Sequence, residues 1–241
     1  MQAQEISIAN QISSLSISEQ LVYLVESTSE NNLDDYSREH YLLAVITGCI
    51  ADLFILNKIH FGSSRIILNN NPKQVSDYLT DIMKKILSTR DEKSIFYILL
   101  DMNEQQMSKI ESKIVKDLIA KKWLVREHEG PFILGKRYLQ ANDDELRINL
   151  YNALKNDLNA NGELPEKVMF LLTLLDEIDF LPKLFESKEE LEYCRSHLQI
   201  NIKHDRIAKL FSREIQNELK FNEIEHMTKH HGGGLDIGRI F

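Results

Sequence analysis

The sequence predicts a mainly helical protein, folded as one compact domain around a buried central helix and carrying small peripheral β-hairpins. Three observations lead to this prediction. The segment from Tyr41 to Leu56 is apolar at thirteen of its sixteen positions. Other segments repeat apolar residues at the three- and four-residue spacing of amphipathic helices. Only two regions combine short β-prone runs with turn-forming residues.

The apolar segment is expected to be a buried helix rather than a membrane span. Thr47, Gly48 and Asp52 interrupt it, whereas a span needs about 20 nearly uninterrupted apolar residues. An aspartate at bilayer depth is also costly. We therefore expect a central helix over residues 38–58, wrapped by other helices.

Composition limits the classes of function. The formal net charge is −8, which disfavours nucleic acids and anionic membranes unless a local basic face attracts them. The two cysteines, Cys49 and Cys194, form no disulfide framework, as expected in a reducing compartment. The chain starts without a basic, apolar signal segment, so we expect a cytoplasmic protein.

The elements of the first half follow from local patterns. Ser16 and Glu19 have the spacing of a capping box before a helix over residues 18–27. After the central helix, two β-prone runs, 59–61 and 65–68, flank Gly62-Ser63-Ser64 and predict a hairpin. Residues 73–87 predict an amphipathic helix, and residues 94–102 a short buried one. The apolar face of the former comprises Val75, Leu79, Ile82, Met83 and Ile86.

Residues 103–139 predict a helix followed by a β-hairpin, which is the pattern of a winged-helix unit. Met107, Ile110, Ile114, Leu118 and Ile119 mark the apolar face of the helix. The run WLVREHEGPFILGKRYL then reads as a strand, a turn at residues 129–131, and a second strand.

The remaining chain is expected to be helical over residues 144–158, 166–176, 180–185, 188–199 and 205–229. Ser187 and Glu190 predict a second capping box. We divide the chain into a flexible N-terminus (1–15), one helical domain (16–229) and a flexible, glycine-punctuated tail (230–241).

Five segments, in this order, resemble the Golgi phosphoprotein 3 family. They are LVYLVES, TGCIADLFILNKIHF, KIESKIVKDLIAKKWLV, LRINLYNAL and KVMFLLTLLDEIDFLPKLFE. In the second, Gly48, Asp52, Leu53, Leu56 and Ile59 are in register with the family pattern. The similarity spans residues 15 to 200 and implies a mainly helical domain with peripheral hairpins. The chain resembles a divergent, bacterial member.

The resemblance also implies a function. Eukaryotic members are peripheral membrane proteins that bind phosphatidylinositol 4-phosphate and act as adaptors retaining glycosyltransferases in the Golgi. Their headgroup site uses a tryptophan and three arginines. In this sequence the tryptophan position falls near Ser37, beside Tyr36, and the arginines fall on Ile46, Ser108 and Glu111. The arginine headgroup site is therefore not retained.

A weaker anion site is predicted from lysines. Lys109, Lys113 and Lys116 recur on one helix face, with Arg38 expected nearby. The alternative is a solvated helix face, since Glu111 and Asp117 lie among them. We expect a non-enzymatic adaptor that contacts an anionic membrane surface or a protein partner, without a cofactor. The predicted contacts are Tyr36, Arg38, Lys109 and Lys113.

The runner-up function is a winged-helix nucleic-acid binder, with the lysines on the recognition helix and Arg126, Lys136 and Arg137 on the wing. The net charge and neighbouring glutamates oppose it.

Other polar residues allow both structural and functional interpretations. His226, His230 and His231 could bind a metal or form a frayed helix end. Cys194 could be activated by a neighbouring base or occupy an ordinary helix position. Asp52 is expected to pair with a basic residue or a helix end. Residues 176–179 are expected to be a solvated junction between helices, because no calcium-binding pattern is present.

Overall fold

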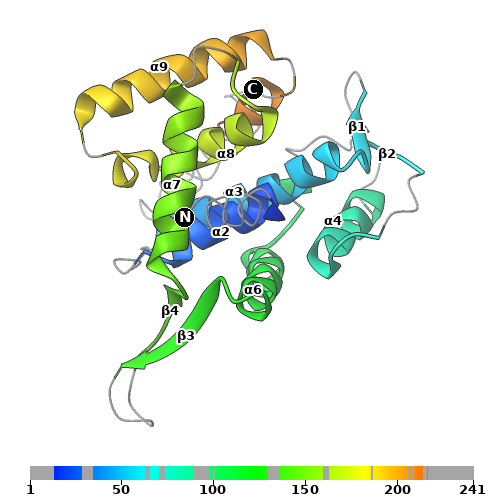
Figure 1. The fold of residues 1–241 in the computed structure, drawn as a ribbon. Coiled ribbons are helices and arrows are strands. Elements are labelled where there is room, and N and C mark those ends of the chain that lie inside the picture. Colours follow the sequence, from blue (N-terminus) through cyan, green and yellow to red (C-terminus); the bar gives the residue numbers. More distant parts are fainter. Residues whose placement is uncertain are drawn as a thin grey trace, which may run out of the picture.

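The computed structural model of the chain describes residues 14–28, 35–62, 66–70, 74–88, 98–99, 101–129, 136–159, 163–185, 187–205, 207, 209–213 and 216. The predicted fold class is confirmed. The described part is a mainly helical single domain with two small antiparallel hairpins (Figure 1). None of the helices in this part combines the length and the apolar character that a membrane span requires.

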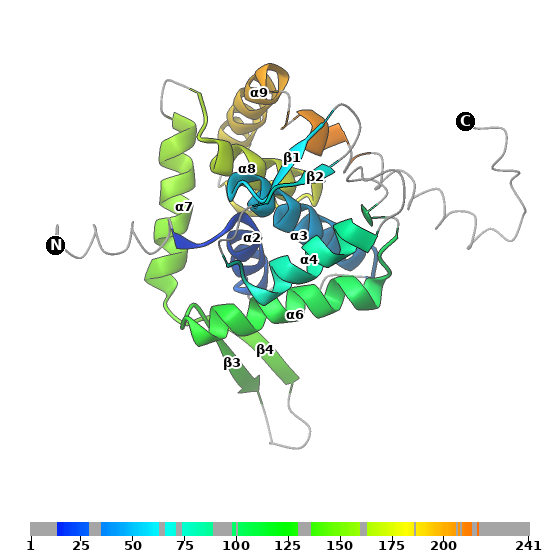
Figure 2. The same cartoon turned by 90° about the vertical axis from the view of Figure 1, so that its right-hand side faces the viewer.

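Helix α3, Asp35–Ile55, is the hub of the fold. Residues 41–53 are all buried, and the helix contacts α2, α4, α6 and α8. It lies among these helices in both ribbon views (Figures 1 and 2). The helix ends before the expected residue 58 because Asn57 adopts a left-handed conformation, with φ of 53°. The amide of Lys58 then donates back to the carbonyl of Leu53, as in a helix C-cap.

Helix α2, Ile17–Glu26, packs closely against α3. The predicted capping box is present: the Ser16 side chain accepts from the amide of Glu19, and the Glu19 carboxylate accepts from the amide of Ser16. A Cβ added to Gly48 would lie 3.4 Å from the Cα of Ser18. The glycine therefore allows the two helices to approach closely.

The first hairpin pairs β1, Ile59–Phe61, with β2, Ile66–Leu68, in the register Ile59↔Leu68. Helix α4, Asp77–Ser88, follows. Of its predicted apolar face, Leu79, Ile82 and Ile86 are buried, whereas Val75 and Met83 are partly buried against the core. The short helix expected over 94–102 lies largely outside the described residues, although Ile98 and Leu99 are buried and helical.

The predicted helix and wing are also present. Helix α6, Glu104–Ala120, leads into β3, Leu124–Glu129, which pairs with β4, Lys136–Ala141. A further capping box, formed by Asn103 and Gln106, begins α6 and was not predicted. The two strands project from the helical body at the end of the molecule where α6 lies (Figures 1 and 2). The expected turn at residues 129–131 lies mainly outside the described residues.

The C-terminal half adds α7, Asp144–Asn159; α8, Glu166–Glu177; the 3-10 helix η1, Leu181–Lys183; and α9, Lys188–His204. Helix α9 crosses the end of the molecule opposite the β3–β4 hairpin (Figure 1). Beyond it, Phe211 packs on Phe170 and Phe61, with ring centroids 4.9 and 5.5 Å away. Most of the helix expected over 205–229, and the whole tail 230–241, lie outside the described residues.

Candidate functional site

The predicted site residue Arg38 lies in the second turn of α3, where α2 and α6 come together. Its Nη1 is 3.4 Å from a carboxylate oxygen of Glu26, the last residue of α2. Its Nη2 is 3.0 Å from a carboxylate oxygen of Glu111 on α6. The guanidinium also lies over the ring of Tyr41, 5.1 Å from the centroid. Three helices thus place two carboxylates and one aromatic ring around one arginine.

The positive charge of Arg38 is already neutralised from within the protein. The side chains of Glu111 and Glu26 are only 8% and 16% exposed, so both carboxylates are held next to the guanidinium. Burial, followed by the negative charge of Glu111, raises the pKa of Glu26. A phosphate oxygen would have to displace a glutamate and remain beside two carboxylates. The geometry therefore opposes a phosphate site at Arg38.

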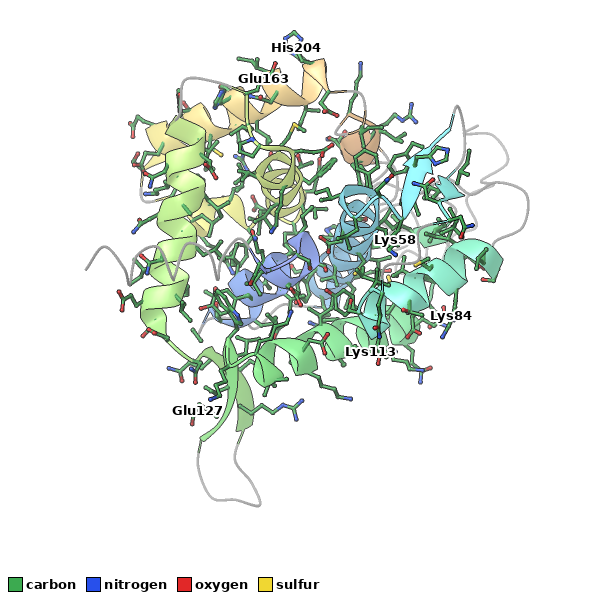
Figure 3. All side chains as sticks on the ribbon, turned by 45° about the vertical axis from the view of Figure 1, so that its right-hand side comes forward. Lys58, Lys84, Lys113, Glu127, Glu163 and His204 are labelled. Carbon is green, nitrogen blue, oxygen red and sulfur yellow. The ribbon has the colours of Figure 1, made fainter. Side chains whose placement is uncertain are left out.

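Lys113, another predicted site residue, does not join Arg38 in an anion site. Lys113 points to α4 and forms an ion pair with Asp81, where α4 and α6 lie side by side (Figure 3). The hydrogen bond from Lys113 lowers the pKa of Asp81. Lys109 is exposed on α6. Tyr36 belongs to the first turn of α3, but its side chain lies outside the described part.

A different set of cations is free on the outer side of α6 and β3. Lys109 and Lys116 are exposed two turns apart on the helix, Lys122 follows the helix end, and Arg126 is exposed on β3. We call these four residues the basic stripe. Within the described ranges, no ion pair engages any of them. The helical spacing of the lysines had suggested that Lys113 belongs to this group. Its ion-pair partner, Asp81, lies on α4, so this contact could not be predicted from the residues around Lys113.

The buried Asp52 is a structural anchor for α2. Its carboxylate accepts hydrogen bonds from the amide of Ile17 at 2.7 Å, the amide of Ser18 at 3.1 Å and the hydroxyl of Ser18 at 2.6 Å. Asp52 therefore holds the N-terminus of α2, which is the helix-end pairing expected from the sequence. Burial raises the pKa of Asp52 to about 6 even though these hydrogen bonds oppose the shift.

Neither cysteine is a reactive thiol. Cys49 and Cys194 are both fully buried. Burial raises the pKa of Cys49 well above its usual range and that of Cys194 to about 12. The guanidinium of Arg195, next to Cys194, is instead engaged by Asp176 at 2.8 Å and Asp179 at 3.6 Å. The structure thus favours the ordinary helix position for Cys194.

The acidic residues at the end of α8 form ion pairs and hydrogen bonds with neighbouring segments. Besides the two contacts with Arg195, the Glu177 carboxylate accepts from Ser212 at 3.3 Å and from Gln216 at 3.0 Å. Among the described residues, no group of three or more histidine, cysteine or acidic side chains could hold a metal ion. The histidines 226, 230 and 231 lie outside those residues.

The described surface includes two pockets. One, of about 330 Å³, lies between α7 and the start of α9. The other, of about 450 Å³, lies between β1 and the segment after α9. Neither is lined by Arg38 or by the basic stripe.

No protein-family model matches this sequence, and a search of curated proteins gives no significant match.

Proposed function

We propose that this chain is a non-enzymatic cytoplasmic adaptor that attaches reversibly to anionic membrane surfaces through the end of the molecule formed by α6 and the β3–β4 hairpin. We further propose that it is a divergent member of the Golgi phosphoprotein 3 family. Family membership is supported by the serial order of the five resembling segments. The attachment mode is supported by the surface described next.

One observation carries the proposal: a projecting hairpin and an unpaired basic stripe share one end of the molecule. Figures 1 and 2 both place α6 beside the base of the projecting strands. Residues 130–135, which join the paired strand ends Glu129 and Lys136, have the sequence GPFILG. The apolar sequence between these strands and the exposed lysines on α6 would together supply the two weak attractions that make membrane binding reversible.

The expected affinity is modest and dependent on salt. Each basic residue near an anionic leaflet contributes about 1 kcal/mol. The basic stripe has four such residues, whereas the molecule as a whole carries a formal net charge of −8. Local attraction therefore competes with overall repulsion. The electrostatic attraction between the basic stripe and the membrane decays within a Debye length, which is about 8 Å at physiological ionic strength. Added salt shortens this length and should therefore release the protein.

The arginine cluster argues against recognition of one particular headgroup. Arg38 is held by Glu26 and Glu111, and Lys113 is held by Asp81. Free lysines act as flexible point charges and select phosphate geometry poorly. Binding should therefore follow the surface charge of the membrane more closely than the identity of the phosphoinositide.

Co-sedimentation with liposomes tests the proposal. The full chain should sediment with vesicles rich in phosphatidylserine at low salt, and should stay in the supernatant with neutral phosphatidylcholine vesicles or at high salt. The double variant Lys109→Glu/Lys116→Glu and the single variant Phe132→Asp should each reduce the bound fraction several-fold.

Two matched variants complete this experiment. Lys188→Glu/Lys203→Glu makes the same charge change on α9, at the opposite end of the molecule, and should bind like the unmodified chain. Arg38→Gln should also retain binding. The proposal is rejected if no anionic vesicle is bound at low salt. It is also rejected if the α9 variant loses as much binding as the α6 variant, because bulk charge would then explain the result.

The helix-and-hairpin arrangement also supports the runner-up, a nucleic-acid-binding winged helix. The outer face of α6 is accessible, and Arg126 lies on the strand that would form the wing. Glu127 is exposed next to it, however, and would repel phosphate. A gel shift with mixed-sequence DNA at low salt separates the two functions, because the membrane proposal predicts no retarded band.

A further inference from the structure

The 330 Å³ pocket between α7 and α9 lies away from the proposed membrane-binding end and has a chemistry of its own. Its apolar lining comes from three elements: Leu158 on α7, Phe185 after η1, and Cys194 on α9. Leu158 and Cys194 are buried. Because burial raises the pKa of the Cys194 thiol, this wall of the pocket carries no charge near neutral pH.

Three charged side chains line the same pocket. Lys155 comes from α7, and Glu189 and Glu190 come from the first turn of α9. The Lys155 ammonium is 3.4 Å from Glu190 and lies over the rings of Tyr151 and Phe185, at 5.5 and 5.8 Å from their centroids. Within the described part of the chain, no ion pair engages Glu189. The pocket therefore offers one positioned cation and one free carboxylate beside an apolar wall.

The charges decide which ligand class is complementary. A purely anionic ligand would meet Lys155 but would be repelled by Glu189 and Glu190. A purely cationic ligand would meet the two carboxylates but would be repelled by Lys155. A ligand with both charges suits the pocket: the Glu190 side chain is 49% exposed and can turn to solvent, so a ligand carboxylate can take its place on Lys155 while the ligand ammonium group faces Glu189.

We propose that this pocket binds a single free amino acid with an apolar side chain. Its carboxylate would contact Lys155, its ammonium group would contact Glu189, and its side chain would pack on Phe185 and Tyr193, above the buried Leu158 and Cys194. A volume of about 330 Å³ is at the small end of ligand pockets, which range from about 300 to 1,000 Å³. That size suits one amino acid better than a nucleotide. The ring of Tyr193, which is 50% exposed, lines the pocket as well.

Isothermal titration calorimetry of the full chain with L-leucine and L-phenylalanine tests this assignment. Two analogues remove one charge each: leucinamide lacks the carboxylate, and isocaproate lacks the ammonium group. Both analogues should bind at least about tenfold more weakly than leucine, because each leaves a charged side chain of the pocket unpaired. Glycine, which has no apolar body, should bind similarly weakly.

Substitutions locate the binding. Lys155→Met and Glu189→Gln should each weaken leucine binding at least about tenfold. Lys203→Met and Glu192→Gln make the same changes on exposed α9 positions outside the pocket and should have no effect. The inference is overturned if none of the tested amino acids binds. It is also overturned if leucinamide or isocaproate binds as tightly as leucine, or if the pocket variants and the matched variants behave alike.

Discussion

At the scale of single residues, buried charged side chains hold the helices of this protein together. Asp52 accepts three hydrogen bonds at the N-terminus of α2, and the neighbouring carbonyl of Leu15 accepts one from Lys167 on α8. The carboxylate of Glu19, besides closing its capping box, binds Lys121 at the end of α6. One helix N-terminus is thereby fixed to three other helices.

The pKa of Asp52 leads to a prediction about pH. Burial raises it to about 6 from 3.8, so the folded state holds this proton more tightly than the unfolded chain does. The associated stability is fully present below about pH 4 and is lost as the pH rises through about 6. A shift of roughly two pKa units corresponds to at most about 3 kcal/mol in the free energy of unfolding.

Urea unfolding of Asp52→Asn between pH 4 and 7 checks this. The unmodified chain should gain stability from Asp52 as the pH falls, whereas the variant should show a flatter dependence because its amide does not titrate. Asp81→Asn, at the partly buried ion pair with Lys113, provides the comparison. If the free energy of unfolding changes with pH in the same way for the Asp52 variant and the unmodified chain, the raised pKa of Asp52 is contradicted.

At the scale of elements, helix starts differ in how completely they are capped. Ser16 accepts from the amide of Glu19, and its hydroxyl also lies 3.2 Å from the Tyr78 hydroxyl, in a partly buried site. At α9, Ser187 accepts from the amide of Glu190, but the Glu190 carboxylate pairs with Lys155 instead of closing the box. The second capping box expected from the sequence is therefore only half formed.

This difference predicts unequal costs of removing the two caps. Ser16→Ala should lower the free energy of unfolding by about 1–2 kcal/mol, and Ser187→Ala by about 0.5–1 kcal/mol, within the range known for N-caps. Chemical denaturation of both variants, with Ser196→Ala on the exposed side of α9 as a control, gives the measurement. Equal losses at both positions would be inconsistent with the hydrogen bonds described.

Most elements could be predicted because their signals are local. The apolar spacing of α4 and α6, the capping residues of α2 and the turn formers between β1 and β2 all act within a few residues. The central helix was predicted from its apolar length, yet its end was placed too late. The left-handed conformation of Asn57, on which the early end depends, is not evident from the surrounding polar residues.

The site was less predictable because it depends on contacts between distant segments. Arg38 was singled out, but neither of its partners, Glu26 and Glu111, was identified as such from the sequence. Lys109 and Lys113 look equivalent in a helical pattern, although one is exposed and the other is bound by Asp81 of α4. Periodicity identifies the face of a helix, but it does not identify what covers that face.

At the scale of the whole molecule, a closed helical body separates two surfaces of different character. The α6 and β3–β4 end carries the basic stripe and the projecting strands, whereas the α7–α9 end carries the charged pocket (Figures 1 and 2). Between them, residues 41–53 of α3 are buried and contribute to neither surface. The central claim is that the first of these surfaces is the one that meets a membrane.

Site-specific fluorescence tests that claim most directly. Cys49 and Cys194 are buried with raised thiol pKa values, so a cysteine introduced at position 133 can be labelled selectively with an environment-sensitive dye. With Ile133→Cys, the emission should shift to the blue on addition of phosphatidylserine vesicles. A dye at Ser196→Cys on α9 should be unaffected. A shift at position 196 without one at position 133, or no shift at either position, would contradict attachment through the hairpin.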